Sequence, residues 1–218
     1  SNADIDHWKS HQYVVRTKAM TTLDTYRLVS WIDELTQWPE VPGKWMKYYE
    51  AGVAKRQLCR IENFVQYHDG LSELLRGPKV IDAVSQLMGE AAVLFKEKIN
   101  FKLPGGSGFG AHQDAPAFGM FGHRYHITMM VALDNATVEN GCLEMSDSVP
   151  VGDILEQDVA GTIRSDIESE LPWNPLPVRA GDVVFFDSYI PHRSRPNNSV
   201  SPRRALYITY NRLADGDV

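Results

Sequence analysis

The stretch GAHQDAPAF, residues 110–118, places a histidine and an aspartate two positions apart. In an extended segment, side chains two residues apart project to the same face, so His112 and Asp114 can bind one metal ion. His192 could supply a third ligand, because it follows an apolar stretch that is typical of a strand. Two imidazoles and one carboxylate leave three adjacent positions open on an octahedral iron(II) ion, as oxygenase chemistry requires. The sequence therefore predicts that His112, Asp114 and His192 form a catalytic iron site.

An arginine downstream of His192 could hold an organic anion beside this metal. The stretch RRALYITYNR, residues 203–212, has the β-branched and aromatic residues of a strand. Arg203 would then share one face of the strand with Tyr207, and Arg204 would lie on the other face. A guanidinium binds a carboxylate through two parallel hydrogen bonds. We predict this role for Arg203, and Arg204 stays an alternative because a shift of one residue exchanges the two faces.

The first half of the chain is predicted to be mostly helical. Thr21 and Asp24 have the spacing of a capping box, and a helical pattern of apolar residues follows them as far as Trp38. Residues 60–68, RIENFVQYH, are expected to be extended. Residues 69–89 carry apolar side chains at helical spacing on both sides of a Gly-Pro pair, which predicts one or two amphipathic helices.

The second half of the chain changes to the period of a β-strand. The predicted strands are AAVLFKEKINFKL, YHITMMVAL, GCLEM, DVVFFDSY and RALYITYNRL. Residues 151–173 are expected to be an inserted loop with a short helix around DIESEL. Strands without long helices between them favour an antiparallel sandwich of the jelly-roll type, here flanked by the N-terminal helices. We expect one domain over residues 4–218, with 1–3 as the remnant of an expression tag.

Composition limits the classes of partner. The chain has 22 Lys and Arg against 28 Asp and Glu, a net charge of −6, so no basic surplus favours nucleic acid or an anionic membrane. No apolar run is long enough to span a bilayer, and no secretory leader is evident. Two cysteines, Cys59 and Cys142, fit a reducing cytoplasm better than a disulfide scaffold. A small-molecule substrate is therefore expected, and the oligomeric state is left open.

Several longer stretches resemble the phytanoyl-CoA dioxygenase family of iron(II)- and 2-oxoglutarate-dependent oxygenases. The matching stretches are RIENF, KINFKLPGGSGFGAHQD, MVALDNATVENGCLEM, AGDVVFFDSYIPHRSRPN and RRALYITYNR. The resemblance implies a double-stranded β-helix with mostly β structure. It also implies an enzyme that uses O₂ and 2-oxoglutarate to hydroxylate an unactivated C–H bond, releasing succinate and CO₂.

The same resemblance implies roles for individual residues. His112, Asp114 and His192 would hold the iron, and Arg203, helped by Ser194, would hold the far carboxylate of 2-oxoglutarate. Further contacts to this co-substrate are implied for Arg60, Lys98, Gln113 and Met130. The turn after ENGCLEM departs from the family pattern, because SDSVPVGD replaces a Pro-Gly-Ser-His-like turn.

The substrate is predicted to be small, polar and anionic. The sequence resembles most closely bacterial members of the family that act on such molecules, including aminoalkylphosphonate hydroxylases. Candidate pocket residues with cationic or hydrogen-bonding side chains are Lys98, Asn100, Lys102, His123, Arg124 and His126. An acyl-CoA hydroxylase and a natural-product tailoring oxygenase remain alternatives within the family.

Two further classes are rivals to an oxygenase. A cupin-like zinc enzyme would use a different ligand set, HxH with a glutamate and a third histidine, and it would not turn over 2-oxoglutarate. A non-catalytic family member would bind a ligand without chemistry, and the intact triad and arginine argue against it. Measuring succinate formation separates both rivals from an oxygenase.

Overall fold

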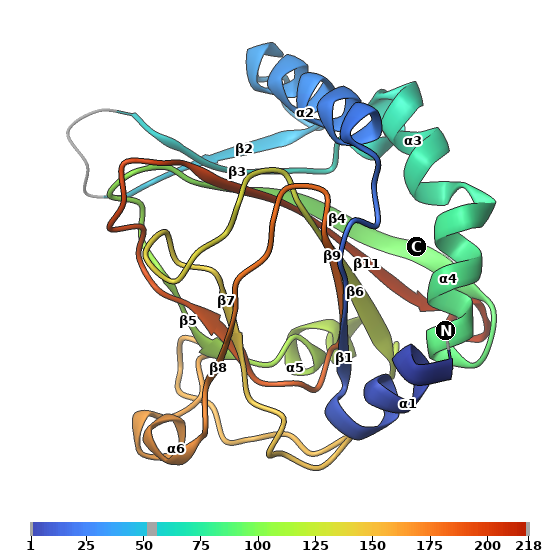
Figure 1. The fold of residues 1–218 in the computed structure, drawn as a ribbon, viewed down its shortest axis with the longest axis vertical. Coiled ribbons are helices and arrows are strands. Elements are labelled where there is room, and N and C mark those ends of the chain that lie inside the picture. The colour runs from blue at the N-terminus through green and yellow to red at the C-terminus, as the bar shows by residue number, and fades with distance from the viewer. Residues whose placement is uncertain (1, 52–55, 217–218) are drawn as a thin grey trace.

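Two antiparallel sheets form the centre of the molecule in the computed structural model, which describes residues 2–51 and 56–216 (Figure 1). The larger sheet has the order β1 (Tyr13–Arg16), β9 (Val183–Asp187), β6 (His126–Ala132), β11 (Arg203–Arg212), β4 (Ala92–Lys102), β3 (Leu58–Glu62) and β2 (Met46–Tyr49). The smaller sheet has the order β5 (Phe109–His112), β10 (His192–Ser194), β7 (Leu143–Met145) and β8 (Asn174–Leu176). All neighbouring strands are antiparallel, which confirms the predicted jelly roll.

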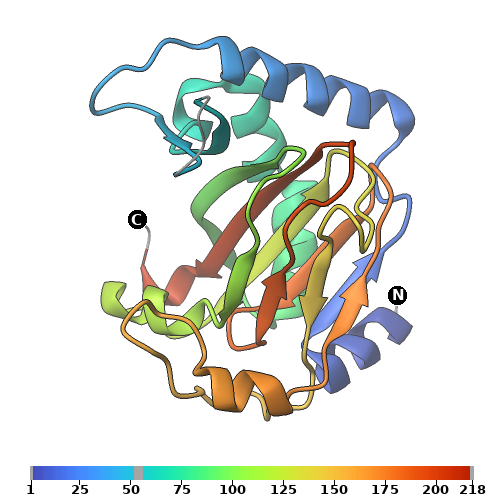
Figure 2. The ribbon, with the colours of Figure 1, turned by 90° about the vertical axis from the view of Figure 1, so that its left-hand side faces the viewer.

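Helices lie mainly on the side of the larger sheet that faces away from the smaller one (Figures 1 and 2). The helices are α1 (Asn2–His11), α2 (Thr22–Gln37), α3 (Asp69–Arg76), α4 (Pro78–Met88), α5 (Ala115–Phe118) and α6 (Ser165–Glu170). Short 3-10 helices are η1 (Val65–Tyr67), η2 (Gly119–Phe121) and η3 (Leu213–Asp215). Helix α6 lies in the predicted loop 151–173, and η1 takes the end of a stretch that was expected to be extended.

Local sequence signals set the ends of these helices. The Thr21 hydroxyl caps α2 by accepting from the backbone N–H of Asp24 at 3.1 Å, as predicted. Two helices, α3 and α4, occupy residues 69–88, because Pro78 cannot continue a helix but suits the first position of a new one. Gly89 ends α4 with a left-handed φ of 80°.

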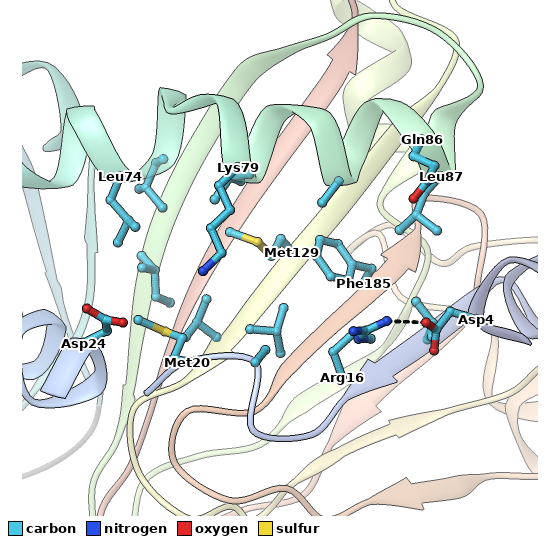
Figure 3. Close-up of a pocket in the computed structure, with 18 of the residues that line it drawn as sticks. Asp4, Arg16, Met20, Asp24, Leu74, Lys79, Gln86, Leu87, Met129 and Phe185 are labelled. Carbon is cyan, nitrogen blue, oxygen red and sulfur yellow. Dashed lines mark hydrogen bonds and ion pairs between the residues drawn. The ribbon is translucent and has the colours of Figure 1, made fainter. Parts of the chain in front are cut away.

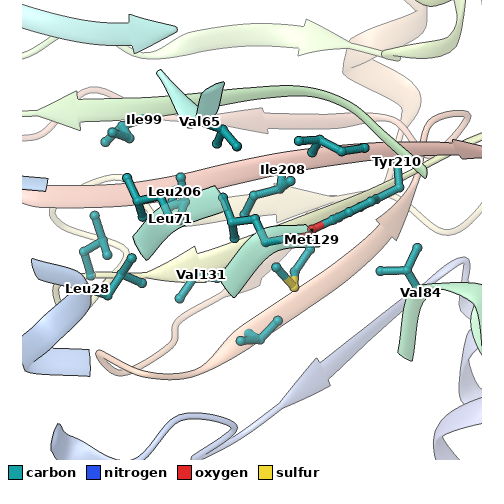
Figure 4. Close-up of a cluster of buried hydrophobic side chains, with 14 of the residues drawn as sticks. Leu28, Val65, Leu71, Val84, Ile99, Met129, Val131, Leu206, Ile208 and Tyr210 are labelled. Carbon is teal, nitrogen blue, oxygen red and sulfur yellow. Dashed lines mark hydrogen bonds between the residues drawn. The ribbon is translucent and has the colours of Figure 1, made fainter. Parts of the chain in front are cut away.

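One face of β11 packs under the helices (Figure 4). Leu206 and Ile208 on this outer face are fully buried against side chains such as Leu28 of α2 and Leu71 of α3. Burial of a Leu or Ile side chain contributes about 1.5–3 kcal/mol. This cluster fixes the larger sheet to the helical layer and thereby sets which face of β11 turns inward.

The other face of β11 looks into the space between the two sheets. Ala205 and Tyr207 lie there in a second apolar cluster with Met130 of β6 and Phe186 of β9. Met145 of the smaller sheet closes the cluster from the opposite side. The alternation of residues 203–212 predicted that Arg203 and Tyr207 share a face, and this inner face is that face.

Strand β4 contains a bulge on its pairing with β11. Thr209 pairs with Lys96, but Tyr210 pairs with Leu94, so Phe95 is an extra residue without a partner. Leu94 packs in the outer cluster. Phe95 and Lys96 instead approach the ring of Phe118 on α5, which lies on the inner side of the sheet. The bulge therefore turns two consecutive side chains of β4 to the inner face.

A cavity of about 440 Å³ lies on the outer side of the larger sheet, below α4 (Figure 3). Its walls include Leu75, Met129 and Phe185, and an ion pair between Arg16 and Asp4 borders it. Because the sheet separates this cavity from the inner face, it is not part of the site described below. Of the helices in the described residues, none is long and apolar enough to cross a membrane.

The predicted domain boundaries are not tested by the fold. Asn2 and Ala3, which the sequence assigns to a tag remnant, form the start of α1. Residues 217 and 218, the predicted end of the domain, lie outside the described part of the chain.

Candidate metal and co-substrate site

Neighbouring strands of the smaller sheet bring the two candidate histidine ligands together. His112 ends β5 and pairs in register with His192 at the start of β10, with ring centroids 4.2 Å apart. Asp114 follows His112 by two residues, at the start of α5. Its carboxylate oxygens lie 3.9 Å from Nε2 of His112 and 4.0 Å from Nε2 of His192. One ligand atom from each residue lies within 4.8 Å of the others, so the three can hold one metal ion.

The hydrogen bonds of both histidines leave Nε2 available as a ligand. Nδ1 of His112 lies 2.8 Å from the carbonyl oxygen of Gly110, and Nδ1 of His192 lies 3.0 Å from that of Ile190. A carbonyl only accepts, so each Nδ1 carries the proton and each Nε2 keeps its lone pair. Burial, with a smaller contribution from His112, lowers the pKa of His192 to about 4 and keeps its ring neutral.

Asp114 is held as a carboxylate. Burial alone would raise its pKa, but the electrostatic effect of its neighbours, His192 and Lys98 among them, outweighs burial and lowers it. An ionised carboxylate with two neutral imidazoles is the donor set that iron(II) accepts in a facial triad. The site therefore fits a divalent transition metal with open positions.

Arg203 is a buried cation with donors available for an anion. The residue is 1% exposed, and its Nη2 donates to the Tyr207 hydroxyl at 3.2 Å. Its Nε and Nη1 have no hydrogen-bond partner in the described structure. A buried guanidinium without a carboxylate is costly, because its desolvation is not compensated. A dicarboxylate such as 2-oxoglutarate would satisfy these donors, and the site fits that co-substrate.

Lys102 adds a second buried cation at the same end. It is 2% exposed, pairs with Arg203 across β4 and β11, and donates to the Ser194 hydroxyl at 2.7 Å and the Arg195 carbonyl at 2.5 Å. Burial, followed by the charge of Arg203, lowers the pKa of Lys102 to about 7. The sequence assigned Lys102 to the substrate, whereas the structure groups it with Arg203 and Ser194.

Gly141 makes room for this lysine. It has a left-handed φ of +76°, and a Cβ at this position would lie 2.9 Å from Lys102 Nζ and overlap the Arg195 carbonyl. The turn at Asn140-Gly141 is thus fixed by a close approach as well as by backbone conformation.

Other candidate co-substrate residues line the same face of the sheet. Arg60 of β3 donates to the Asn100 amide oxygen at 3.2 Å and pairs with Glu62 at 3.3 Å. Lys98 lies opposite Tyr207, with its ammonium 5.5 Å from the ring, and Met130 pairs with Tyr207 from the other side. Burial lowers the pKa of Lys98. The alternation of β4 thus brings Lys98, Asn100 and Lys102 to the inner face.

Gln113 has a different environment from the residues around it. Its amide nitrogen donates to the carbonyls of Asp153 at 2.8 Å and Tyr189 at 2.5 Å, and its amide oxygen accepts from the Leu155 N–H at 2.8 Å. Because Gln113 lies between His112 and Asp114, its side chain projects away from the metal ligands. One amide hydrogen and the amide oxygen hold the 153–155 loop, and the second amide hydrogen binds the Tyr189 carbonyl, so these contacts connect two loops.

The remaining substrate candidates differ in how far their side chains are exposed to solvent. Arg124 is exposed, and in the part of the chain that the structure describes its hydrogen bonds, with Asp215 and Tyr189, come from backbone atoms. His123 and His126 are buried beside aromatic side chains, Phe118 among them. Burial lowers the pKa of His126 to about 4.

Sequence reasoning did not identify two residues of this region as part of the site. The Tyr207 hydroxyl contacts Arg203, and the only signal was their shared face on one strand. Phe118 follows Asp114 on the single turn of α5 and carries no sequence signal beyond its place after HQD.

The sequence matches the phytanoyl-CoA dioxygenase family (PhyH) over residues 24–205, which include the triad and Arg203. A protein from an uncultured bacterium named 2-aminoethylphosphonate dioxygenase is 49% identical over 212 residues, 96% of this chain and 81% of that protein. A protein of Gimesia maris named methylphosphonate hydroxylase is 40% identical over 218 residues, 100% of this chain and 83% of that protein.

Solved structures show the same fold at low sequence identity. The crystal structure of EctD from S. alaskensis with 2-oxoglutarate and 5-hydroxyectoine is 18% identical, with a TM-score of 0.85 over 99% of this chain and 77% of that one. The family match and the relatives agree with the triad and with the buried arginine beside it. The chain belongs to the phytanoyl-CoA dioxygenase family and is an iron(II)- and 2-oxoglutarate-dependent dioxygenase.

Proposed function

We propose that this dioxygenase hydroxylates a small organophosphonate. The observation that carries the proposal is a pair of unpaired lysines, Lys96 and Lys98, on the inner face of β4 beside the candidate metal ligands. The names of the relatives at 49% and 40% identity support the same class of substrate.

Both lysines act on the metal site but have no counter-ion of their own. Neither ammonium has a hydrogen bond or an ion pair to any described residue; Lys96 lies 5.8 Å from the Phe118 ring and Lys98 lies 5.5 Å from Tyr207. Both lower the pKa of Asp114 through their charge. A bound metal would neutralise the Asp114 carboxylate and leave these two partly buried lysines without a nearby negative charge. An anionic ligand would supply that charge.

The chemistry of the simplest phosphonate explains why this position suits the anion. In methylphosphonate, the only C–H bonds lie on the carbon that carries phosphorus. A hydroxylase of such a compound must therefore hold the phosphonate within one bond of the oxidised carbon, next to the metal. Lys96 and Lys98 are suited to that role, because charge-assisted hydrogen bonds from ammonium groups would orient phosphonate oxygens.

We assign the remaining groups as follows. His112, Asp114 and His192 hold the iron, and Arg203, with Ser194, Lys102 and Tyr207, holds the far carboxylate of 2-oxoglutarate. Arg60 and Met130 line the co-substrate position, and Lys98, which lies between Lys96 and Lys102 on the same face of β4, borders both the co-substrate and the phosphonate. Bound iron and 2-oxoglutarate supply the oxidising power, with one oxygen atom of O₂ entering succinate and the other entering the substrate as a hydroxyl. The apolar side chains of the inner face, Phe186 among them, exclude water from the reacting groups.

The proposal is tested by succinate release in the presence of iron(II), 2-oxoglutarate and candidate substrates. Methylphosphonate, ethylphosphonate and 2-aminoethylphosphonate are expected to stimulate turnover, and phytanoyl-CoA is not. Lys96→Met should raise the apparent KM for phosphonates about tenfold, the effect of losing a charge-assisted contact. Its KM for 2-oxoglutarate should stay unchanged. Stimulation by the acyl thioester alone would replace this proposal with an acyl-CoA hydroxylase.

We also propose that the enzyme works in the cytoplasm. Free cysteines at positions 59 and 142 support this, since a reducing compartment keeps thiols free. Fractionation of cells that express the natural gene would test it, and recovery of the protein outside the cytoplasm would contradict it.

A further inference from the structure

Buried polar atoms without partners gather around His126. Both ring nitrogens of His126, Nδ1 of His123 and Oδ1 of Asn211 have no hydrogen bond in the described structure. All three residues are more than nine-tenths buried, and Asn211 is fully buried. Buried polar atoms in proteins are nearly always paired, so a cluster of unpaired ones indicates a ligand that the protein is built to receive.

Strand pairing places this cluster on the inner face of the larger sheet. His126 and Asn211 are direct partners across β6 and β11. One step along the same face, Thr128 and Thr209 are hydrogen-bonded to each other at 2.9 Å. The Asn211 amide nitrogen donates to the backbone carbonyls of residues 212 and 216, which leaves its amide oxygen as a fixed acceptor.

Aromatic rings surround the two histidines. The His126 ring lies 4.8 Å from Phe95 and 4.8 Å from Phe118, tilted by 54° and 60° to them. His123 lies 5.6 Å from His126 and 5.3 Å from Phe95. The face of an aromatic ring attracts an ammonium group, and several rings close together form the aromatic cages that bind such groups.

The cluster adjoins the metal site. The backbone N–H of Phe118 donates to the Asp114 carbonyl at 3.2 Å, and the Asp114 charge acts on His126. Lys96 approaches the Phe118 ring, whose other neighbours include Phe95 and His126. Phe118 is thus a common neighbour of the lysine proposed to hold the phosphonate and of the histidine cluster.

The chemistry of the cluster suits a cation. Burial, with a smaller effect of the neighbouring His123, lowers the pKa of His126 to about 4, so the His126 ring is neutral at pH 7 and does not repel a positive group. A neutral imidazole offers one acceptor nitrogen, and the Asn211 oxygen only accepts. An ammonium group supplies three donors and a charge that favours π-faces.

We propose that His126, His123 and Asn211, with the rings of Phe95 and Phe118, bind the ammonium end of an aminoalkylphosphonate. The inference rests on the proposed function, since it requires that Lys96 and Lys98 take the phosphonate. The two ends of the substrate then bind to residues that both neighbour Phe118, which is itself hydrogen-bonded to the metal-ligand residue Asp114. These residues select phosphonates that carry an amine over those that do not.

Two phosphonates of the same carbon skeleton test the selection. The ratio of kcat/KM for 2-aminoethylphosphonate to that for ethylphosphonate is measured by succinate release. Binding of each compound to the iron- and 2-oxoglutarate-loaded protein is measured by calorimetry without oxygen. The wild-type ratio should be well above one. His126→Phe, which keeps a ring but removes both nitrogens, should lower it about tenfold through loss of 2-aminoethylphosphonate affinity.

A second variant and a control keep the test decisive. Phe118→Leu removes a π-face and should lower the ratio in the same direction, so the test does not depend on the folding of one variant. His7→Phe changes a histidine of α1 that stacks on His11 and should leave the ratio unchanged. A wild-type enzyme that does not prefer the amine, or a ratio unchanged in both site variants, overturns the inference but not the proposed function. If no phosphonate stimulates turnover, the proposed function itself fails.

Discussion

Arg203 and Arg204 are neighbours in sequence and identical in chemistry, yet they lie in opposite environments. Arg204, on the outer side of β11, donates to both Asp134 oxygens at 2.8 and 2.9 Å and to Asp33 at 2.7 Å. Arg203, on the inner side, is more deeply buried, and among the described residues its guanidinium donates only to the Tyr207 hydroxyl. The protein thus pairs the Arg204 guanidinium with two carboxylates of its own and leaves the Arg203 guanidinium available to a ligand.

The same contrast extends along the two faces of the larger sheet. Arg212, at the end of β11, pairs with Asp215 at 2.9 Å and with Glu90 at 3.5 Å. On the inner face, Lys96, Lys98 and Lys102 have no ion pair with a described carboxylate within bonding distance. A cation with its own counter-ion serves the fold, and a buried cation without one indicates binding.

The largest effect is expected from the metal ligands. Asp114→Ala removes the only carboxylate of the triad, so we expect loss of stoichiometric iron binding and of turnover, with the fold retained. Metal analysis, succinate release and thermal unfolding measure the three properties. Asp134→Ala is the matched control on the outer face and should keep iron. Full activity in Asp114→Ala would show that the triad is not the metal site.

The two arginines provide the second test. Arg203→Ala should raise the apparent KM for 2-oxoglutarate tenfold or more, since a desolvated charge pair is worth about 2–5 kcal/mol. Arg204→Ala should leave this KM unchanged and instead lower the free energy of unfolding by about 1–3 kcal/mol, because it breaks charged hydrogen bonds. Steady-state kinetics and denaturant unfolding measure the two effects. If Arg204→Ala raises the KM and Arg203→Ala lowers only the stability, the far carboxylate of 2-oxoglutarate binds Arg204 instead.

The pKa of Lys102 predicts that binding of 2-oxoglutarate depends on pH. Its pKa is about 7 without ligand, so the ammonium beside Arg203 is lost as pH rises through that value. Below pH 7 two cations attract the far carboxylate, and above it one remains. The dissociation constant of 2-oxoglutarate should therefore rise between pH 6.5 and 8.5, by about tenfold at most per pH unit. Lys102→Met should bind more weakly and lose this part of the pH dependence; an equal rise in that variant would contradict the assignment.

Tyr207 should give the smallest effect. Tyr207→Phe removes the single hydrogen bond to Arg203, and a bond of this kind contributes about 0.5–1.5 kcal/mol. We expect a several-fold rise in KM for 2-oxoglutarate with little change in kcat. Thr128→Val, on the same face but away from Arg203, is the control. A loss in kcat without a change in KM would give Tyr207 a role in the reaction instead of in co-substrate binding.

Short-range patterns in the sequence account for part of this architecture. The alternation in residues 203–212 correctly separated the two faces of β11, and the HxD spacing placed His112 and Asp114 on one side. The short strands β5, β8 and β10 were not predicted, because three or four residues are too few to show a period. The contacts of Gln113 and Lys102 were also out of reach, since they depend on loops that are distant in sequence.

The bulge at Phe95 has a consequence for how such an enzyme can diversify. On the C-terminal side of the bulge, β4 keeps an unbroken register with β11 from Lys96 to Lys102, which aligns Lys102 with Arg203 at the position assigned to 2-oxoglutarate. On the N-terminal side, the extra residue at Phe95 has already shifted the register. A change there need not alter the pairing of residues 96–102 with β11. Substitutions at Phe95 or in α5 could therefore alter which molecule is oxidised while the oxidising machinery is inherited intact. One inserted residue would let selection act on the two ends of a single strand separately.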